Sequence, residues 1–357
     1  MNLVIPTTKL LPFGITKMRS IRRSKRTSTV SQTQRSDATA NRNHDAFTAL
    51  DDGLYENEGA NCEIHMYERR YNSRGEAILL QSGTRSEFAW ATERSIEAAL
   101  ILTRYYSIRK DLETTVLEIK SPYIRAALKA VIRSYPGVNI NSNGPILIPD
   151  DPMCLFHYRD ELYTYASKIR NKKAKEHIMF LLQYMTKVLE REITSYEELM
   201  QNEDVPPGLE FRNLWMAFKP GILLYHKMNG IDQLSRLRTI TKVRPFQQPE
   251  YWTLVSEMLF YDGKNFRFVA MKAMITNYDG YRPLAEFEHF PLQYHEHEQS
   301  IRTALLERGK KYITFLGIHH LMYEGPAETI NWYGRSGQIS MVRKPFRAWT
   351  QSIDMAS

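Results

Sequence analysis

The sequence contains only two cysteines among its 357 residues. Cys62 and Cys154 lie far apart and fit neither a C-x-x-C motif nor a metal-knuckle spacing, so we expect free thiols and a reducing compartment. Long apolar runs are also missing, because none approaches the roughly 20 residues that a membrane-spanning helix needs. We therefore expect neither a disulfide framework nor a membrane segment.

Motifs for phosphate binding and catalysis are absent as well. Gly263-Lys264 and Gly309-Lys310 have no glycine five positions before their own glycine and no Ser or Thr after the lysine, so neither is a phosphate-binding loop. The sequence also has no G-x-S-x-G motif, no H-E-x-x-H motif and no context that activates a cysteine. We expect no catalytic residue, no cofactor and a protein that is not an enzyme.

One histidine-rich region leaves a metal-dependent enzyme open as an alternative. His295 and His297 could bind a metal from an extended strand, but adjacent histidines at 319 and 320 point to opposite faces of any strand. The competing interpretation is a polar loop that leads into a helix, and no metal ligand is assigned. The region contains His289, His295, His297, His319 and His320, with Glu296 and Glu298 among them.

Positive charge is concentrated at the beginning of the chain. The formal net charge is +8. Residues 1–44 contain a single acid, Asp37, and all of the excess positive charge: Lys9, Lys17, Arg19, Arg22, Arg23, Lys25, Arg26, Arg35 and Arg42. The remaining chain is close to neutral, so we expect any nucleic-acid binding to occur through this tail only.

The same segment lacks hydrophobic periodicity after Met18, which predicts a disordered basic tail. An acidic-leaning linker, 45–61, completes the first region, 1–61. The cluster Arg22-Arg23-Ser24-Lys25-Arg26 resembles a nuclear localisation signal, whereas Pro6 and Pro12 argue against the amphipathic helix of a mitochondrial presequence. We expect an intracellular protein, nuclear or cytoplasmic, with a mitochondrial location left open.

From residue 62 to 119 the pattern predicts two β-hairpins. The first joins Cys62–Met66 to Ala77–Leu80 through Asn72–Gly75, and the second joins Ala98–Tyr106 to Thr115–Ile119.

Residues 120–205 show helical spacing. Ser121-Pro122 predicts a helix start, and Pro136-Gly137 predicts its end. We interpret Asp150-Asp151-Pro152 as a second start, with helix capping favoured over a catalytic pair of carboxylates. A longer helix is expected at Lys175–Glu192, and the capping-box pattern Ser195–Glu198 predicts the start of a short one.

Residues 206–343 are mainly extended, with one helix at Glu298–Phe315 and a hairpin turn at Asp262–Asn265. The predicted fold is α+β, with a helical segment packed on a bent antiparallel sheet or a small partly open β-barrel. Residues 62–343 form this domain, and 344–357 are a C-terminal tail. The strands expected in this region are Leu214–Phe218, Ile222–Lys227, Leu234–Thr241, Trp252–Tyr261, Phe266–Ile275, Leu284–Phe290, Gly317–Tyr323 and Gln338–Val342.

The run Leu214–Tyr225 is the most informative stretch, because its apolar pattern is broken once, by Pro220-Gly221. Proline favours the second position of a tight turn, and glycine at the third accepts the positive φ of a type II turn. Two interpretations follow. Trp215 and Phe218 can be core residues of a buried strand, or the turn with Lys219 can be the lip of a binding site.

Three further segments carry a family resemblance, namely Phe290–His295, Leu306–Tyr312 and Gly317–Gly325. Together with Leu209–Gly221 they resemble a domain of unknown function that precedes AAA-type ATPase modules in many fungal proteins, and the similarity covers Ser121–Val342. The resemblance implies an accessory domain beside an ATPase, with the ATPase module absent here. Its motif positions have no assigned role, and they are Trp215, Phe218, Lys219, Pro220, Gly221, Arg308, Gly309 and Lys310.

Three functions remain as hypotheses. The first is a non-enzymatic interaction domain whose partner is an AAA-type ATPase or one of its clients. The second is a nucleic-acid- or chromatin-associated module that uses the basic tail. The third is a metal-dependent enzyme that uses the region His289–His320.

Overall fold

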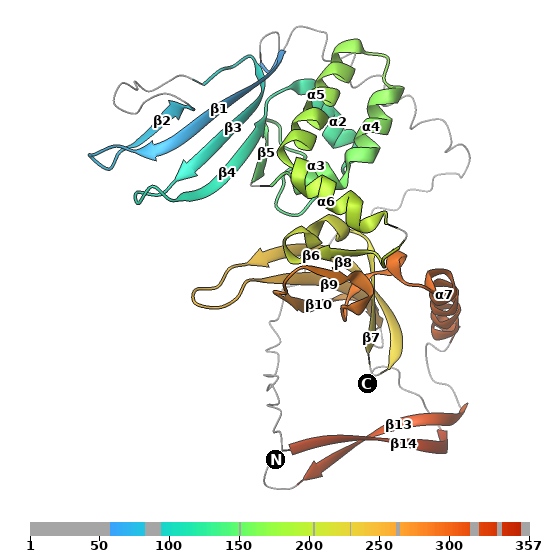
Figure 1. The fold of residues 1–357 in the computed structure, drawn as a ribbon. Helices are drawn as coiled ribbons and strands as arrows, with labels where there is room; N and C mark the ends of the chain where they lie inside the picture. The colour runs from blue at the N-terminus through green and yellow to red at the C-terminus, as the bar shows by residue number, and fades with distance from the viewer. Residues whose placement is uncertain are drawn as a thin grey trace, which may run out of the picture. The chain divides into compact units, whose positions relative to one another are not determined.

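Figure 1 presents a computed structural model of the chain. It describes residues 58–82, 94–149, 151–202, 204–228, 230–261 and 265–314, and the backbone alone of 321–333 and 338–350. The chain divides into two units, Met1–Arg42 and Asn43–Ser357, and all described residues belong to the second. The predicted basic tail, residues 1–44, therefore lies outside the described residues.

The first sheet contains both predicted hairpins. Its strand order is β2-β1-β3-β4-β5, with β1 and β3 parallel and the other neighbours antiparallel. In the turn between β1 and β2, Asn72 Oδ1 accepts the N–H groups of Arg74 and Glu76 at 2.9 Å each. The strands are β1 (Asn61–Tyr71), β2 (Ala77–Gln81), β3 (Ala98–Tyr106), β4 (Leu112–Ile119) and β5 (Ile146–Pro149).

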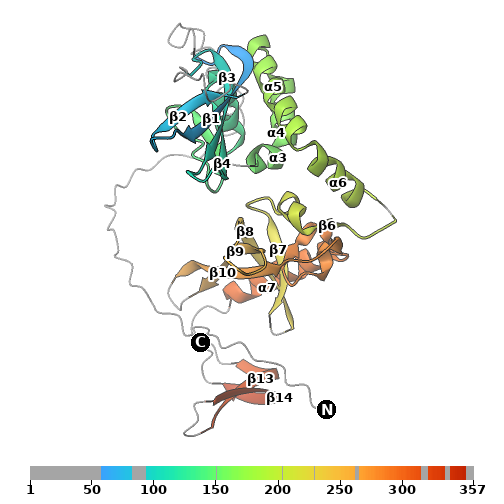
Figure 2. The same ribbon diagram turned by 60° about the vertical axis from the view of Figure 1, so that its left-hand side comes forward.

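Five helices accompany this sheet; α5 contacts β1, and α2 packs against α5 (Figure 1 and Figure 2). The predicted cap at Ser121 is confirmed, because its Oγ accepts the N–H of Ile124 at 3.3 Å. The helices are α2 (Pro122–Val131), α3 (Met153–His157), α4 (Arg159–Lys168), α5 (Lys172–Val188) and α6 (Glu190–Met200).

Of the two other predicted helix starts, one is confirmed and one is wrong. Helix α3 begins at Met153, directly after the predicted start, and its N-cap residue is Pro152. Ser195 lies inside α6, because that helix begins at Glu190, directly after the buried Leu189 that ends α5. A buried residue at the junction thus outweighs the local capping pattern.

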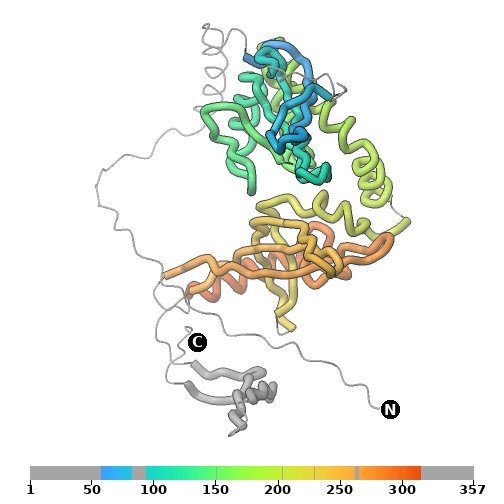
Figure 3. Tube along the Cα trace, turned by 90° about the vertical axis from the view of Figure 1, so that its left-hand side faces the viewer, coloured from blue at the N-terminus to red at the C-terminus, as the bar shows by residue number. Residues whose placement is uncertain are grey.

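The second sheet is antiparallel and open, with the order β10-β9-β8-β7-β12. Figure 3 follows the chain from the first sheet, in blue, through the helices to this sheet, in yellow and orange. The α+β prediction is confirmed, and none of the described sheets closes into a barrel. The strands are β7 (Leu223–Met228), β8 (Ile231–Val243), β9 (Tyr251–Tyr261), β10 (Phe266–Thr276) and β12 (Phe290–Pro291).

Four further strands form two separate two-stranded sheets. Strand β6 (Gly208–Glu210) pairs with β11 (Tyr281–Pro283), and β13 (Leu321–Tyr333) pairs with β14 (Gln338–Thr350). The predicted helix near the C-terminus is confirmed as α7 (Glu298–Thr314). Three 3-10 helices complete the described elements: η2 (Phe211–Ala217), η3 (Leu284–Glu286) and η4 (Leu292–Tyr294).

Several predicted strands differ from the structure. Leu214–Phe218 is not a strand but belongs to η2, and most of Leu284–Phe290 is η3 and loop. A short continuous apolar run fits a buried helix as well as a buried strand, so periodicity alone could not separate them. Strand β14 extends to Thr350, into residues that the sequence assigned to a C-terminal tail.

One hydrophobic core connects the helices with the second sheet. Leu155 and Phe156 of α3, Trp215 of η2 and Leu237 of β8 all belong to it. The Phe156 and Trp215 rings meet edge to face, with centroids 5.3 Å apart. Among the described residues, no helix combines the length and the apolar character needed to cross a bilayer.

Candidate functional site

The Lys219-Pro220-Gly221 turn has the geometry that the sequence predicts. The Ile222 N–H donates to Lys219 O at 3.2 Å, and Gly221 has a φ of 98°. These are the closing bond and the positive angle of a type II turn. The Gly221 N–H donates to Leu237 O at 2.8 Å, and the Leu237 N–H donates to Ile222 O at 2.9 Å. Two backbone hydrogen bonds therefore join the turn to β8.

Trp215 and Phe218, which precede the turn, are core residues. Trp215 is 2% exposed and Phe218 is fully buried, so the interpretation as core is confirmed for both side chains. They occupy and follow a 3-10 helix rather than a strand. Neither ring is available to a ligand, but both fix the position from which the turn emerges.

Lys219 connects the turn to the helical part of the molecule. Its ammonium group forms an ion pair with Glu161 of α4. The same group lies 4.0 Å from the centroid of the Tyr158 ring, within cation–π range. Lys219 therefore positions the turn and has little freedom to bind a ligand alone.

A buried hydrogen-bond chain lies behind the turn, and the sequence analysis did not identify it. Tyr135 contacts His157 Nδ1 at 2.9 Å, and His157 Nε2 contacts Trp215 O at 2.8 Å. A carbonyl oxygen only accepts, so Nε2 carries the proton and Nδ1 accepts from the Tyr135 hydroxyl. No sequence motif links these residues, because the chain arises from the packing of α3 against η2.

The ionisable groups of this hydrogen-bond chain, and the neighbouring Cys154 thiol, are held neutral. Burial lowers the pKa of His157 to about 4, and the nearby Lys219 and Arg159 charges act in the same direction. Burial also raises the pKa of Tyr135, and it raises the pKa of the Cys154 thiol to about 12. His157 uses both ring nitrogens in existing bonds, so the chain is suited to hold η2 in place rather than to transfer protons.

Two adjoining pockets flank the turn. One has a volume of about 690 Å³ and includes Tyr158 and Gly221 in its wall, and the other measures about 310 Å³ and includes Cys154. Tyr135, Pro136, Pro220 and Thr239 line both pockets. We name this pair of pockets the turn groove, and Pro220 forms part of the wall that its two halves share.

The larger half of the turn groove has an excess of positive charge. It is lined by Arg133, Arg236 and Arg238. Glu257 pairs with Arg236 and, at 3.5 Å, with Arg238, so one carboxylate serves two guanidinium groups. Arg133 is exposed and forms no ion pair within the described part of the chain. Arginines beside tyrosine and proline surfaces suit a ligand that combines a carboxylate or phosphate with an apolar portion.

The motif positions on α7 lie apart from the turn. Arg308 donates to Asp232 O at 2.8 Å and to Gln233 Oε1 at 3.1 Å, at the beginning of β8. The turn contacts Leu237 instead, and five residues of extended strand span about 16 Å. Gly309 and Lys310 are exposed on the same helix. The eight motif positions therefore do not form one site.

The histidine-rich region is divided between two environments. His289 stacks on His226 with ring centroids 4.6 Å apart, whereas His295 lies edge-on to Tyr225 at 4.5 Å. His295 Nδ1 accepts the His297 N–H at 3.0 Å. Within the described ranges, no three His, Cys, Asp or Glu side chains gather as metal ligands would. His319 and His320 lie outside those ranges, so the metal hypothesis is tested only in part.

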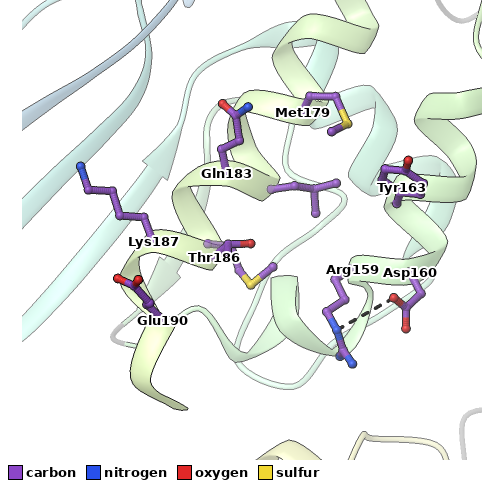
Figure 4. A pocket seen from close by; sticks show the side chains of 10 residues that line it. Arg159, Asp160, Tyr163, Met179, Gln183, Thr186, Lys187 and Glu190 are labelled. Carbon is purple, nitrogen blue, oxygen red and sulfur yellow. Dashed lines mark ion pairs between the residues drawn. The ribbon is translucent and has the colours of Figure 1, made fainter. Parts of the chain in front are cut away.

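A further pocket lies between the helices α4, α5 and α6 (Figure 4). Its volume is about 520 Å³, and Met179, Leu182 and Met185 contribute apolar lining. Arg159 and Asp160 form an ion pair at one side, and Lys187 and Glu190 lie at the other (Figure 4). Because positive and negative groups are balanced, this pocket favours neither sign of ligand.

Comparison with known proteins identifies part of the chain. Residues 201–296 match a family described as "Domain of unknown function (DUF7025)". The matched segment includes η2, the turn and the second sheet but not α7, so it is shorter than the resemblance drawn over Ser121–Val342. No curated protein and no solved structure matches the chain. The family description links the match neither to fungi nor to AAA-type ATPases, so the comparison shows a match to a domain of unknown function at residues 201–296 and no more.

Proposed function

We propose that this protein is a non-enzymatic interaction domain that captures an acidic segment of a partner protein in the turn groove. The observation that carries the proposal is a groove lined by three arginines, of which Arg236 and Arg238 share the Glu257 carboxylate, beside an aromatic and proline surface. An extended peptide with a carboxylate and an apolar side chain complements both features. The partner, as in the fungal domain that the chain resembles, is an AAA-type ATPase or one of its clients.

The titratable groups next to the groove support binding over catalysis. His157 is neutral with both nitrogens bonded, and burial keeps the Cys154 thiol protonated at neutral pH. A general base needs a free lone pair near its proton donor, and a nucleophilic cysteine needs a thiolate. Neither condition is met by these groups.

Selection of random linear peptides on the immobilised whole chain tests the ligand class. We expect enrichment of Asp or Glu beside an apolar residue, and loss of that enrichment in the double variant Arg133→Glu/Arg238→Glu. The control Arg74→Glu/Lys173→Glu changes the charge equally at exposed sites away from the groove and should select the same peptides as the wild type. Equal selection by the groove variant would contradict the proposal.

Quantitative affinity capture with the same three proteins tests the partner. An AAA-type ATPase or a protein bound to one should be depleted from the groove variant and retained by the control. If no such protein differs between the two, the ATPase connection is wrong even where acidic peptides bind.

A further inference from the structure

Strand β10 is an open edge of the second sheet. It pairs with β9 over its whole length, from Phe266 opposite Tyr261 to Thr276 opposite Tyr251. Within the described part of the chain, no strand pairs with its other side. With 11 residues, this edge presents a row of backbone donors and acceptors about 37 Å long.

The edge has little of the usual protection against pairing. Natural edge strands are shortened, bulged or interrupted by proline and charge. Strand β12, the opposite edge of this sheet, follows that rule with 2 residues. In contrast, the β9–β10 register has no shift, and β10 contains no proline and only Arg267 and Lys272 as charged residues.

The hairpin formed by β9 and β10 also exposes apolar side chains on both of its faces. Phe268 is 61% exposed, Met274 is 57% exposed and Leu259 of β9 is 55% exposed. Phe268 shares a face with Leu259, its register partner, whereas the exposed Val269 lies on the opposite face. Exposed apolar side chains along a free strand edge are characteristic of an interaction site.

We propose that β10 pairs antiparallel with β10 of a second copy of this chain, across a two-fold axis at Met271. In this register Phe268 lies opposite Met274 of the other copy, an aromatic–sulfur pair, and Val269 lies opposite Ala273. Arg267 lies opposite Ile275, and Lys272 lies opposite Ala270. The sequence of β10 is thus complementary to itself, as a symmetric interface requires.

Charge disfavours the register whose axis lies at Lys272. The backbone equally permits a two-fold axis one residue further along, at Lys272. That axis would place two Lys272 ammonium groups directly opposite each other. Like charges in a cross-strand pair are destabilising. The Met271 axis avoids every pairing of like charges and continues the sheet from five strands in one copy into five in the other.

The mass of the whole chain in solution, measured by sedimentation over a concentration series, tests the proposal. We expect a dimer that Met271→Lys and Met271→Glu each convert to a monomer, because each places two like charges at the axis. An equimolar mixture of the two variants should recover the dimer. Phe246→Lys, at a loop position that is 89% exposed, is the control and should leave the dimer intact.

Disulfide trapping provides a second measurement that does not require dissociation. Cα atoms of directly opposed residues lie about 4.5–5.5 Å apart, within disulfide range. In a Cys62→Ser background, Met271→Cys should cross-link two copies, whereas Phe266→Cys should not, since its symmetry mate lies about 34 Å away. A whole chain that stays monomeric, a Lys variant that stays dimeric, or equal cross-linking at both positions would overturn the proposal. An edge that captures only a different protein would do the same.

Discussion

Gly221 isolates the cost of a backbone angle from the cost of a steric clash. Its φ is 98°, yet a Cβ added there meets no atom within 4 Å. Gly221→Ala should therefore reduce the free energy of unfolding by about 1–2 kcal/mol through backbone strain alone. Urea denaturation measures this change.

Gly309 offers the matched control. It lies within α7, where an added Cβ also meets nothing within 4 Å and no left-handed angle is required. Alanine is preferred over glycine inside a helix, so Gly309→Ala should raise stability by about 0.5–1 kcal/mol. Equal effects of the two substitutions would show that the turn does not depend on the glycine angle.

His157 makes stability depend on pH in a defined window. Its folded-state pKa is about 4, below the ordinary value of 6.5. Between these values the unfolded chain binds a proton that the folded chain does not, so stability falls as pH drops from 6.5 towards 4. The loss is about 3 kcal/mol at pH 4 and zero above pH 6.5.

Comparison with His157→Gln separates this effect from that of the other histidines. Glutamine can keep one donor and one acceptor at this position but does not titrate. The stability advantage of the wild type over the variant at pH 7 should shrink by about 3 kcal/mol at pH 4. Unfolding curves recorded at several pH values test this, and a constant difference would mean that residue 157 is protonated in the folded state.

At the scale of elements, the N-caps of α2 and α5 give a direct comparison. Ser121 and Asn171 each accept the N–H three residues ahead, but Ser121 Oγ also contacts His177 Nδ1 at 2.9 Å and is fully buried. Asn171→Ala should cost about 1 kcal/mol, the usual value of a cap. Ser121→Ala should cost about 1–3 kcal/mol more, because it leaves a buried ring nitrogen without its partner. Similar losses in urea unfolding would assign the serine to capping alone.

Strands and helices with clear periodicity were predictable, and so was the turn. Both N-terminal hairpins, the start of α2, strands β7 to β10 and the glycine angle at 221 follow from local patterns. The identity of η2 does not, because an apolar run buried between α3, α6 and β6 has no polar face to define a period.

The turn groove was predictable only in part. The lip, with Lys219, Pro220 and Gly221, is one continuous segment that the sequence could indicate. Its remaining walls come from α2's end, from β8 and from the loop before β5. Such neighbours are set by tertiary packing, and no spacing in the sequence relates Arg133 to Arg238.

For the whole molecule, the distribution of charge separates two modes of binding. The nine basic residues of the first 44 can neutralise phosphates, whereas the rest of the chain is close to neutral. If nucleic acid binds through the tail, a chain that begins at Asp45 should lose affinity for duplex DNA and reduce its log–log salt slope by up to about 8. Filter binding over a salt series tests this, and an unchanged slope would place the phosphate-binding surface on the folded part.

The contact between His157 and Trp215 also governs how the protein unfolds. Tyr135 follows α2, His157 ends α3 and Trp215 lies in η2, so the bonds that join them cross from the helices to the segment that carries the second sheet. Because the core is continuous across the same boundary, neither half can melt without exposing apolar side chains of the other. The two sheets therefore behave thermodynamically as one cooperative unit, and heating should produce a single calorimetric transition whose van't Hoff and calorimetric enthalpies agree.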